Sequence, residues 1–248
     1  MAYGIFNPKG FLMHLDPKLL EEYAAKREID FKAKKGEKSE QMADRFNATI
    51  EKLEDEKRDR VWLELQSVDD MASERGFSYL FDNAKVFRKP VSQEEMDKMN
   101  NYYDRSLWFF LNRHEIFESI SNIYELDYIT GWKRIPVVKK NKELVIEKTK
   151  ELEKALQDYY GLDFKGKNCK IEYYDRGDRI FFTAFIEDLP TSEVAFERGA
   201  LNKQKPVKRV FETLFLYRPE ESILEVKTKG GKEKVKALQE IFSEAVLG

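Results

Sequence analysis

The chain has 248 residues, of which 42% are hydrophobic, 36% charged and 13% aromatic, and its formal net charge is −2. This composition excludes a disordered chain, because disordered chains are poor in aromatic residues, and no stretch approaches the roughly 18 apolar residues of a membrane span. The charge is uneven, with −6 in residues 1–130 and +4 in residues 131–248, but this asymmetry is far from the basic composition of a dedicated DNA binder.

The first part of the chain predicts an all-helical region. Residues 1–13 contain two glycines and a proline, and we expect an irregular lead-in there. Asp16 followed by Pro17 is typical of a helix start, because Asp caps the first turn and Pro lacks an N–H that would be unpaired at this position. Apolar residues spaced by three and four then predict a charged, solvated helix from residue 39 to about residue 66.

A further helix is expected over residues 68–75, ended by Gly76. Pro90 interrupts the pattern, and Ser92 with Glu95 has the spacing of a capping box. We therefore expect a helix that starts at residue 92 and runs beyond residue 116. Its segment 107–111 is apolar on all sides, which predicts the most buried part of the region.

The segment Gly131–Pro136 ends the helical pattern and predicts a domain boundary. We expect a helical domain over residues 1–135 and an α+β domain over residues 136–248. Residues 136–141 are expected to form an extended linker. A helix over residues 142–160 should follow, because its apolar side chains lie on one side and Gly161 is a typical stop.

Beyond residue 161 the apolar period changes from 3.6 to 2, which predicts strands. We expect a polar, basic connection with at most a short edge strand over residues 191–209, because Pro190 is taken to end the second strand. After Gly230 and Gly231 an amphipathic helix closes the chain. The predicted fold class is α+β, with an antiparallel meander of about four strands flanked by helices. The four strands are expected at residues 169–174, 179–187, 210–217 and 223–228.

The strongest catalytic pattern is Glu225-Val226-Lys227 on the fourth predicted strand. An acid and a lysine two residues apart point to the same face of a strand, as in the second half of the PD-(D/E)xK nuclease pattern. There the acid would bind Mg²⁺ and the lysine would activate water. The pattern also needs a second acid, for which Glu187, Asp188 and Glu212 are candidates. An exposed strand face is the simpler interpretation, and Mg²⁺ is expected as a cofactor only under the nuclease hypothesis.

A second hypothesis is nucleic-acid binding by the C-terminal half. Exposed sheet aromatics can stack on bases while lysine and arginine bind phosphate. The residues expected to take part are Tyr174, Lys203, Lys205, Lys208 and Arg209.

The leading hypothesis is a non-enzymatic interaction or regulatory subunit of a larger prokaryotic-type assembly, since two motif-poor regions need no active site. Trp108 and Phe109 are the candidate interaction residues of the helical region, and the partner would be another protein or a second copy. No metal site is predicted. The single cysteine, Cys169, cannot form an internal disulfide, and a cytoplasmic location is therefore expected.

Overall fold

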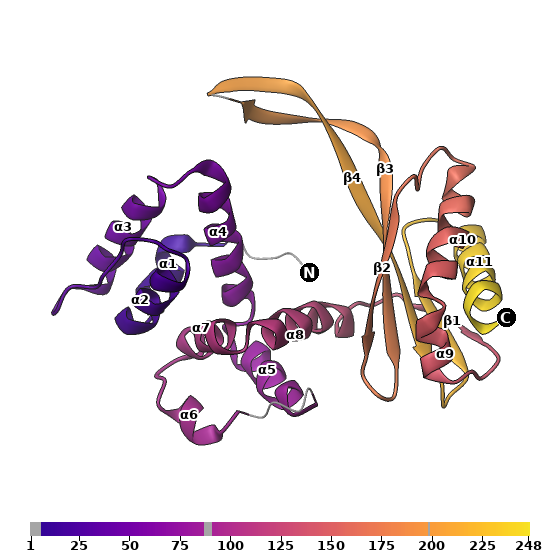
Figure 1. The fold of residues 1–248 in the computed structure, drawn as a ribbon, viewed down its shortest axis with the longest axis horizontal. Coiled ribbons are helices and arrows are strands. Elements are labelled where there is room, and N and C mark those ends of the chain that lie inside the picture. The colour runs from indigo at the N-terminus through magenta and orange to yellow at the C-terminus, as the bar shows by residue number, and fades with distance from the viewer. Residues whose placement is uncertain (1–5, 87–90, 198) are drawn as a thin grey trace. The chain divides into compact units, whose positions relative to one another are not determined.

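A computed structural model describes residues 6–86, 91–197 and 199–248 (Figure 1). Its contacts divide the chain into two compact units, Met1–Tyr128 and Ile129–Gly248, called the helical unit and the sheet unit below. The predicted α+β class is confirmed, because helices form the first unit and the second contains an antiparallel sheet with helices. The predicted breaker Pro90 lies outside the described residues.

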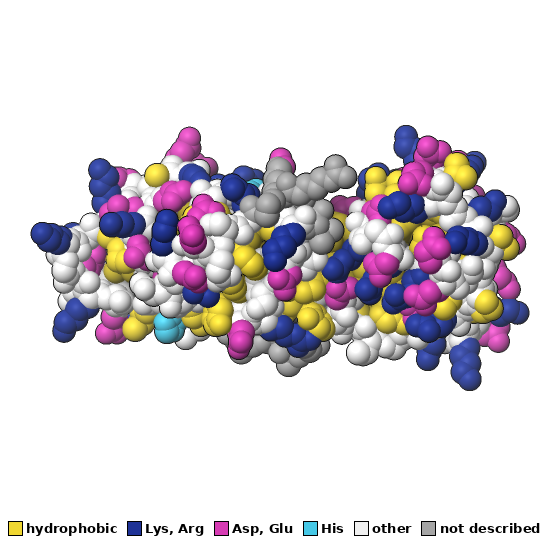
Figure 2. Space-filling view, turned by 90° about the horizontal axis from the view of Figure 1, so that it is seen from below, with side chains coloured by type: hydrophobic (Ala, Val, Ile, Leu, Met, Phe, Trp, Pro, Cys, Tyr) yellow, Lys and Arg dark blue, Asp and Glu magenta, His cyan; other side chains and the backbone are white. Residues whose placement is uncertain are grey.

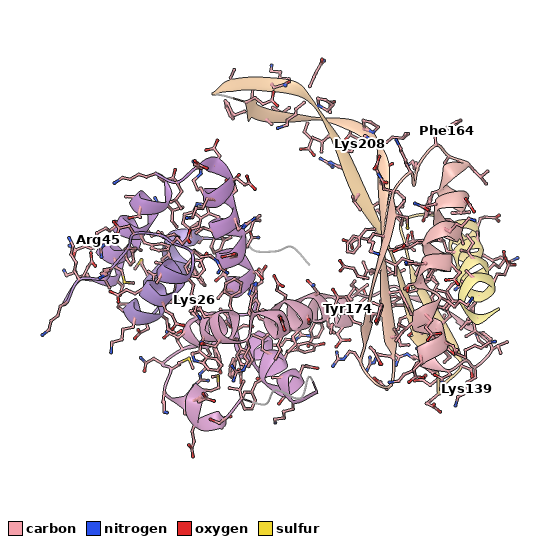
Figure 3. The ribbon with its side chains drawn as sticks, in the orientation of Figure 1. Lys26, Arg45, Lys139, Phe164, Tyr174 and Lys208 are labelled. Atoms are coloured by element: carbon pink, nitrogen blue, oxygen red, sulfur yellow. The ribbon has the colours of Figure 1, made fainter. Side chains whose placement is uncertain are left out.

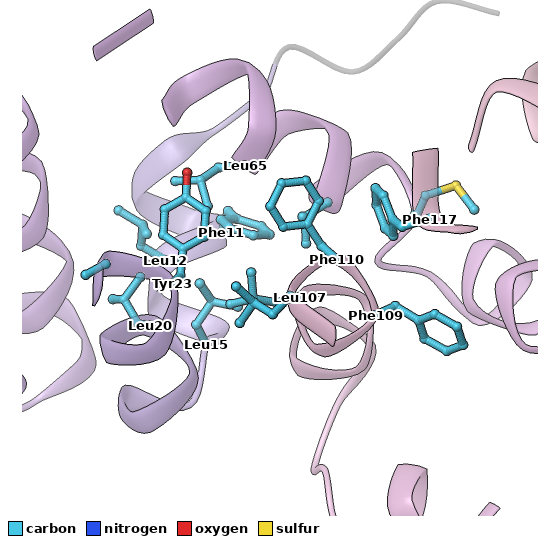
Figure 4. Packing of buried hydrophobic residues seen from close by; sticks show 14 of the residues in the cluster. Phe11, Leu12, Leu15, Leu20, Tyr23, Leu65, Leu107, Phe109, Phe110 and Phe117 are labelled. Atoms are coloured by element: carbon cyan, nitrogen blue, oxygen red, sulfur yellow. The ribbon is translucent and has the colours of Figure 1, made fainter. Parts of the chain in front are cut away.

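The helical unit consists, within its described residues, of helices joined by turns and by a longer loop between Lys26 and Ser39. They are α1 Pro8–His14, α2 Pro17–Lys26, α3 Ser39–Ile50, α4 Asp55–Asp70, α5 Glu74–Val86, α6 Gln93–Asp97, α7 Tyr102–Asn112 and α8 His114–Asp127. Their apolar faces meet in one cluster, part of which Figure 4 shows around Phe11, Tyr23 and Phe110.

Local capping signals locate several helix starts correctly. The Asp16 carboxylate accepts a hydrogen bond from the Lys18 N–H at 2.8 Å, and Pro17 opens α2. Ser92 and Glu95 form the predicted capping box at the start of α6. The expected irregular lead-in is wrong over residues 8–13, because Asn7 caps α1 by the same device that Asp16 provides for α2.

The lengths predicted for the helices expected over residues 39–66, over residues 68–75 and from residue 92 are wrong. The helix expected over residues 39–66 is interrupted between Ile50 and Asp55, where Leu53 turns towards the core. Gly76 lies inside α5 rather than ending a helix. A Cβ atom at this position would come within 2.7 Å of the Met71 carbonyl oxygen, so only glycine permits this close approach. The helix expected from residue 92 is likewise divided into α6, α7 and α8.

A buried carboxylate joins two helix starts in this unit. Asp104, in the first turn of α7, is 2% exposed and accepts hydrogen bonds from the Asp16 N–H at 2.6 Å and from the Asn101 side chain at 3.1 Å. Burial raises the pKa of the Asp104 carboxyl above its ordinary value. Because each donor is supplied by a cap residue, Asp104 fixes the start of α7 against the start of α2.

In the part that the structure describes, the sheet unit has five strands in the order β1-β5-β4-β3-β2, with every neighbouring pair antiparallel. The strands are β1 Lys133–Pro136, β2 Cys169–Asp175, β3 Ile180–Glu197, β4 Ala200–Arg218 and β5 Ile223–Lys227. The four predicted strands are present as β2 to β5. The fifth, β1, pairs with β5 and is built from residues that the sequence placed at a domain boundary. A boundary after residue 135 would therefore cut through β1.

Helices cover one face of this sheet. They are α9 Lys142–Glu147, α10 Thr149–Gly161, α11 Lys232–Phe242 and a π-helical turn, η1 Ser243–Leu247. They pack on alternate strand residues such as Phe182, Phe215 and Leu224, which defines the helix face of the sheet. The intervening residues, including Phe181, Leu216 and Glu225, point to the opposite face, called the second face below. The single helix expected over residues 142–160 is divided near residue 148, where α9 ends and α10 begins.

Candidate interaction surface

Strands β3 and β4 extend together beyond the rest of the sheet (Figure 1). Strand β2 pairs with β3 only as far as Ile186, and β5 pairs with β4 only from Leu214 onwards. Residues 188–197 of β3 and 200–209 of β4 are consequently paired only with each other, and they are called the arm below. The prediction of a polar connection over residues 191–209, with Pro190 as a strand end, is therefore wrong.

Pro190 is compatible with this strand because a bulge precedes it. Glu187 pairs with Val210 and Pro190 with Lys208, so that two residues of β3 lie opposite one residue of β4. A proline can lie in a ladder where its nitrogen faces outwards, as it can on an edge strand. The sequence signal that could have revealed the arm is the alternation that continues past Pro190 on both sides of Gly199.

A second bulge lies nearer the tip and brings apolar residues to one face. Glu193 pairs with Lys205 and Ala195 with Asn202, so here β4 contains the extra residue. Counting alternate residues through the two bulges gives the arm an apolar face, which continues the second face of the sheet, and a polar face on the other side. The side chains of the apolar face are Pro190, Ser192, Val194, Phe196, Leu201, Pro206 and Lys208.

Ion pairs confirm this assignment of the polar face. The carboxylate of Glu193 pairs with Arg209, and that of Glu197 pairs with Lys205 at 3.3 Å and accepts a hydrogen bond from Asn202 at 2.9 Å. These five residues come from both strands, and the alternation assigns all of them to the polar face. Because these residues lie beside one another in the ladder, their charged and amide groups pair within the arm itself.

The described apolar side chains of the apolar face near the tip stay largely exposed. Phe196 and Leu201 are cross-strand neighbours and are 74% and 50% exposed, and Val194 beside them is 66% exposed. Contiguous exposed apolar side chains of this size mark an interaction surface more often than a solvated one. The two outer edges of the arm are poorer candidates, because Pro190 and Pro206 lack the N–H that an added strand would need.

The base of the arm is fixed to the body of the sheet unit. The turn after α10 donates a hydrogen bond from the Gly166 N–H to the Glu187 carbonyl at 2.9 Å, and Lys165 pairs with Asp188 at 2.9 Å. A two-stranded ribbon is marginal alone in water, so these contacts and the continuity with the sheet hold the arm in place.

Most of the predicted nucleic-acid-binding cations are neutralised by β3. Lys205 and Arg209 pair with glutamates on the polar face, and Lys208, at the base of the arm in Figure 3, pairs with Glu187 at 3.1 Å. Within the described residues, Lys203 is the only one of these four cations without an ion pair. Tyr174 is remote from them, because it pairs with Phe181, nine residues before Pro190, or roughly 30 Å along β3.

The geometry around Glu225 differs from that of a metal site. Its side chain is 8% exposed, and its two oxygens accept from Arg134 of β1 at 2.9 Å and from Arg218 of β4 at 3.1 Å. Lys227 points to the same face but donates to the Thr130 carbonyl at 2.5 Å. Two cations therefore occupy the carboxylate that the nuclease hypothesis assigns to Mg²⁺.

None of the three candidate second acids lies beside Glu225. Glu225 pairs with Leu216, and Glu212 is four residues further along β4, which is about 13 Å away; Glu187 and Asp188 lie beyond it. Among the described residues, no group of three His, Cys, Asp or Glu side chains could hold a metal ion. The arginine pair thus explains the burial of Glu225 as part of the sheet, joining β1, β5 and β4.

The other predicted residues occupy structural positions. Phe109 is completely buried in the helical unit, so its interpretation as an exposed docking residue is wrong; the apolar segment around it packs inwards. Trp108 is half-buried beneath the Arg113 guanidinium, 5.7 Å from its ring. Burial raises the pKa of the Cys169 thiol to about 11, which keeps it protonated and poorly nucleophilic near neutral pH.

The surface outside the arm has no single-sign patch on the face shown in Figure 2, where acidic and basic side chains are interspersed. No helix in the described parts of the chain has both the length and the apolar composition needed to cross a membrane. No protein-family model matches the chain, and a search of curated proteins finds no similar sequence. Its function must therefore be inferred from its own residues.

Proposed function

We propose that the chain is a non-enzymatic interaction subunit of a larger assembly, and that it docks on another protein chain through the apolar face of the arm. The observation that carries this proposal is the exposure of Val194, Phe196 and Leu201 on a ribbon whose other face pairs its glutamates with Lys205 and Arg209. Burying such side chains contributes about 25 cal/mol per Å² of apolar area, a gain that the isolated chain forgoes.

The charges of the arm support a protein partner over nucleic acid. Glutamates of β3 pair with three of the four predicted phosphate-binding cations, so the ribbon is close to neutral. Affinity for nucleic acid rises with the number of phosphates that a protein neutralises, and a near-neutral ribbon neutralises few. Nuclease activity through Glu225 and Lys227 likewise stays a prediction, which no contact of the site favours. A cytoplasmic location is part of the proposal and accords with the single cysteine.

The test compares two faces of the same arm in the full-length protein. Phe196→Ser combined with Leu201→Ser removes the apolar surface, and Val207→Ser on the polar face is the matched control. Affinity capture and mass photometry should show that the wild type and the control bind the same partner chain, whether a second copy or another protein. The double variant should lose this binding while its thermal midpoint is unchanged. Binding retained by the double variant, or a wild type that is monomeric and captures nothing, would contradict the proposal.

A further inference from the structure

We propose that the loop between α2 and α3 binds the phosphate backbone of a nucleic-acid duplex through four lysines. They are Lys32, Lys34, Lys35 and Lys38, and the segment 32–38 that contains them is called the lysine loop below. The loop belongs to the end of the helical unit that α2 and α3 form in Figure 1. This inference concerns a different surface from the arm and is independent of the docking proposed for it.

The lysine loop concentrates positive charge at the surface. All four lysines are exposed, and none of them has an ion pair with another described residue. Acidic and basic side chains are interspersed over the face shown in Figure 2, and the loop is a local departure from that pattern. Four like charges within seven residues repel one another in the isolated chain, and such a run is typical of surfaces that bind nucleic acid or another polyanion.

The backbone of the lysine loop is held in place by groups other than the lysine ammonium groups. Glu37, the only acid in the loop, accepts two bonds from the Arg45 guanidinium at 2.9 and 2.7 Å (Figure 3). The same guanidinium lies 4.5 Å from the ring of the buried Phe31. Glu21 of α2 accepts a bond from the Ala33 N–H at 2.7 Å. The loop is therefore ordered before it binds, which lowers the entropic cost of binding.

The acids that flank the loop leave most of its charge uncompensated. Glu40 and Asp44 of α3 both pair with Lys9, each at 2.9 Å. Asp30, two residues before the loop, has no ion pair with another described residue. Since Arg45 neutralises Glu37, four lysines less Asp30 leave a local charge of +3. The −6 of residues 1–130 as a whole matters less, because salt at 0.1 M screens exposed charges beyond about 10 Å.

The uncharged side chains of this segment favour a duplex backbone over other polyanions. Ile29 and Phe31 are buried and Ala33 is half-buried, so residues 29–38 expose no large apolar or aromatic side chain. Single-stranded nucleic acid is held by stacking of bases on exposed aromatic rings. Stable attachment to a membrane needs an inserted apolar group in addition to a basic patch. The phosphates of a duplex need only closely spaced cations.

The number of lysines sets the expected salt dependence. If three to four phosphates are neutralised, the logarithm of the affinity should fall with the logarithm of the salt concentration with a slope of about −2.7 to −3.6. Affinity should therefore drop by about 40- to 150-fold between 50 and 200 mM salt. Phosphate contacts carry no sequence information, so the affinity should not depend on base sequence.

The experiment measures fluorescence anisotropy of labelled duplexes with full-length protein. A DNA and an RNA duplex of the same sequence are used, because phosphate contacts alone do not choose between them. Lys34→Gln combined with Lys35→Gln should weaken binding of any duplex that the wild type binds by at least about tenfold at 50 mM salt and reduce the slope by about 1.8. The matched control is Lys52→Gln combined with Lys98→Gln, two exposed lysines of the same unit. It removes the same charge and should leave the affinity and the slope unchanged.

Three results would overturn the inference. One is a wild type that binds neither duplex at 50 mM salt, and another is equal weakening by the two double variants. The third is tighter binding, at equal concentration of negative charge, to polyglutamate or to vesicles of phosphatidylserine and phosphatidylcholine. Phe196→Ser with Leu201→Ser should bind the duplexes as the wild type does, which separates this site from the docking of the arm. Thermal midpoints equal to that of the wild type verify that each lysine variant is folded.

Discussion

Glu225→Gln tests whether this carboxylate is structural or catalytic. The substitution keeps the size of the side chain. It leaves Arg134 without its carboxylate partner and Arg218 with only the exposed Glu221, 3.6 Å away. The bond to Arg218 joins side chains that are 19% and 8% exposed, and a hydrogen bond between charged groups contributes about 1.5–3 kcal/mol in such a place. The Arg134 side chain is 56% exposed, so its pairing adds only about 0.5 kcal/mol. We expect the free energy of unfolding of the sheet unit to fall by about 2–3 kcal/mol.

Urea unfolding measures this loss through the fluorescence of Trp132, in a background where Trp62 and Trp108 of the helical unit are replaced by Phe. With a slope of about 1.5 kcal/mol per M, the midpoint should fall by more than 1 M. Glu221→Gln is the matched control. Because its side chain is 53% exposed and 3.6 Å from Arg218, it should change stability by less than about 0.5 kcal/mol. Unchanged or increased stability of Glu225→Gln would refute the structural assignment, since replaced catalytic carboxylates often stabilise a protein.

Two further predictions concern pH and close packing. The Arg45 guanidinium holds the pKa of the Glu37 carboxyl at about 2 instead of 4.5, so this pair stabilises the helical unit fully above about pH 4.5 and the contribution is lost as the pH falls towards 2. Glu37→Gln should remove that part of the acid dependence of the thermal midpoint, and parallel curves for the two proteins would contradict this. Gly76→Ala should destabilise the helical unit by about 1–3 kcal/mol because its Cβ meets the Met71 carbonyl. Gly161→Ala, with open space around it, should raise the stability of the sheet unit by about 0.5 kcal/mol. If the two alanine variants changed the thermal midpoint of their units equally, each relative to wild type, the packing argument would be refuted.

Features encoded by neighbouring residues could be predicted from the sequence. Asp16 with Pro17 and Ser92 with Glu95 specify their helix starts through bonds that span two or three residues. The strands β2 to β5 follow from alternation with a period of 2. Asn7 with Pro8 gives the same start signal as Asp16 with Pro17, but it stands among glycines and its helix is only two turns long, so the local pattern predicts irregular structure there.

Features that depend on distant partners could not be predicted in this way. Strand β1 is four residues long and is specified by pairing with β5, about 90 residues later. The two arginines that hold Glu225 come from different strands, and Arg134 is 91 residues away in sequence. The division of the apolar and polar faces of the arm depends on two bulges, one in each strand, and each bulge reverses the alternation in its own strand. Phe196 and Leu201 therefore lie on the second face, although unbroken alternation from Phe182 and Phe215 would place them on the helix face.

The central claim is that the apolar face of the arm contacts another protein chain. Site-specific photocrosslinking tests it most directly, with the same photoreactive amino acid placed at Phe196 on the apolar face or at Val207 on the polar face of full-length protein. The account predicts a crosslinked species from position 196 and none from position 207, and its mass should equal two copies of the chain if the arms pair with each other. Equal crosslinking from the two positions, or none from position 196 at concentrations where the wild type associates, would contradict the claim.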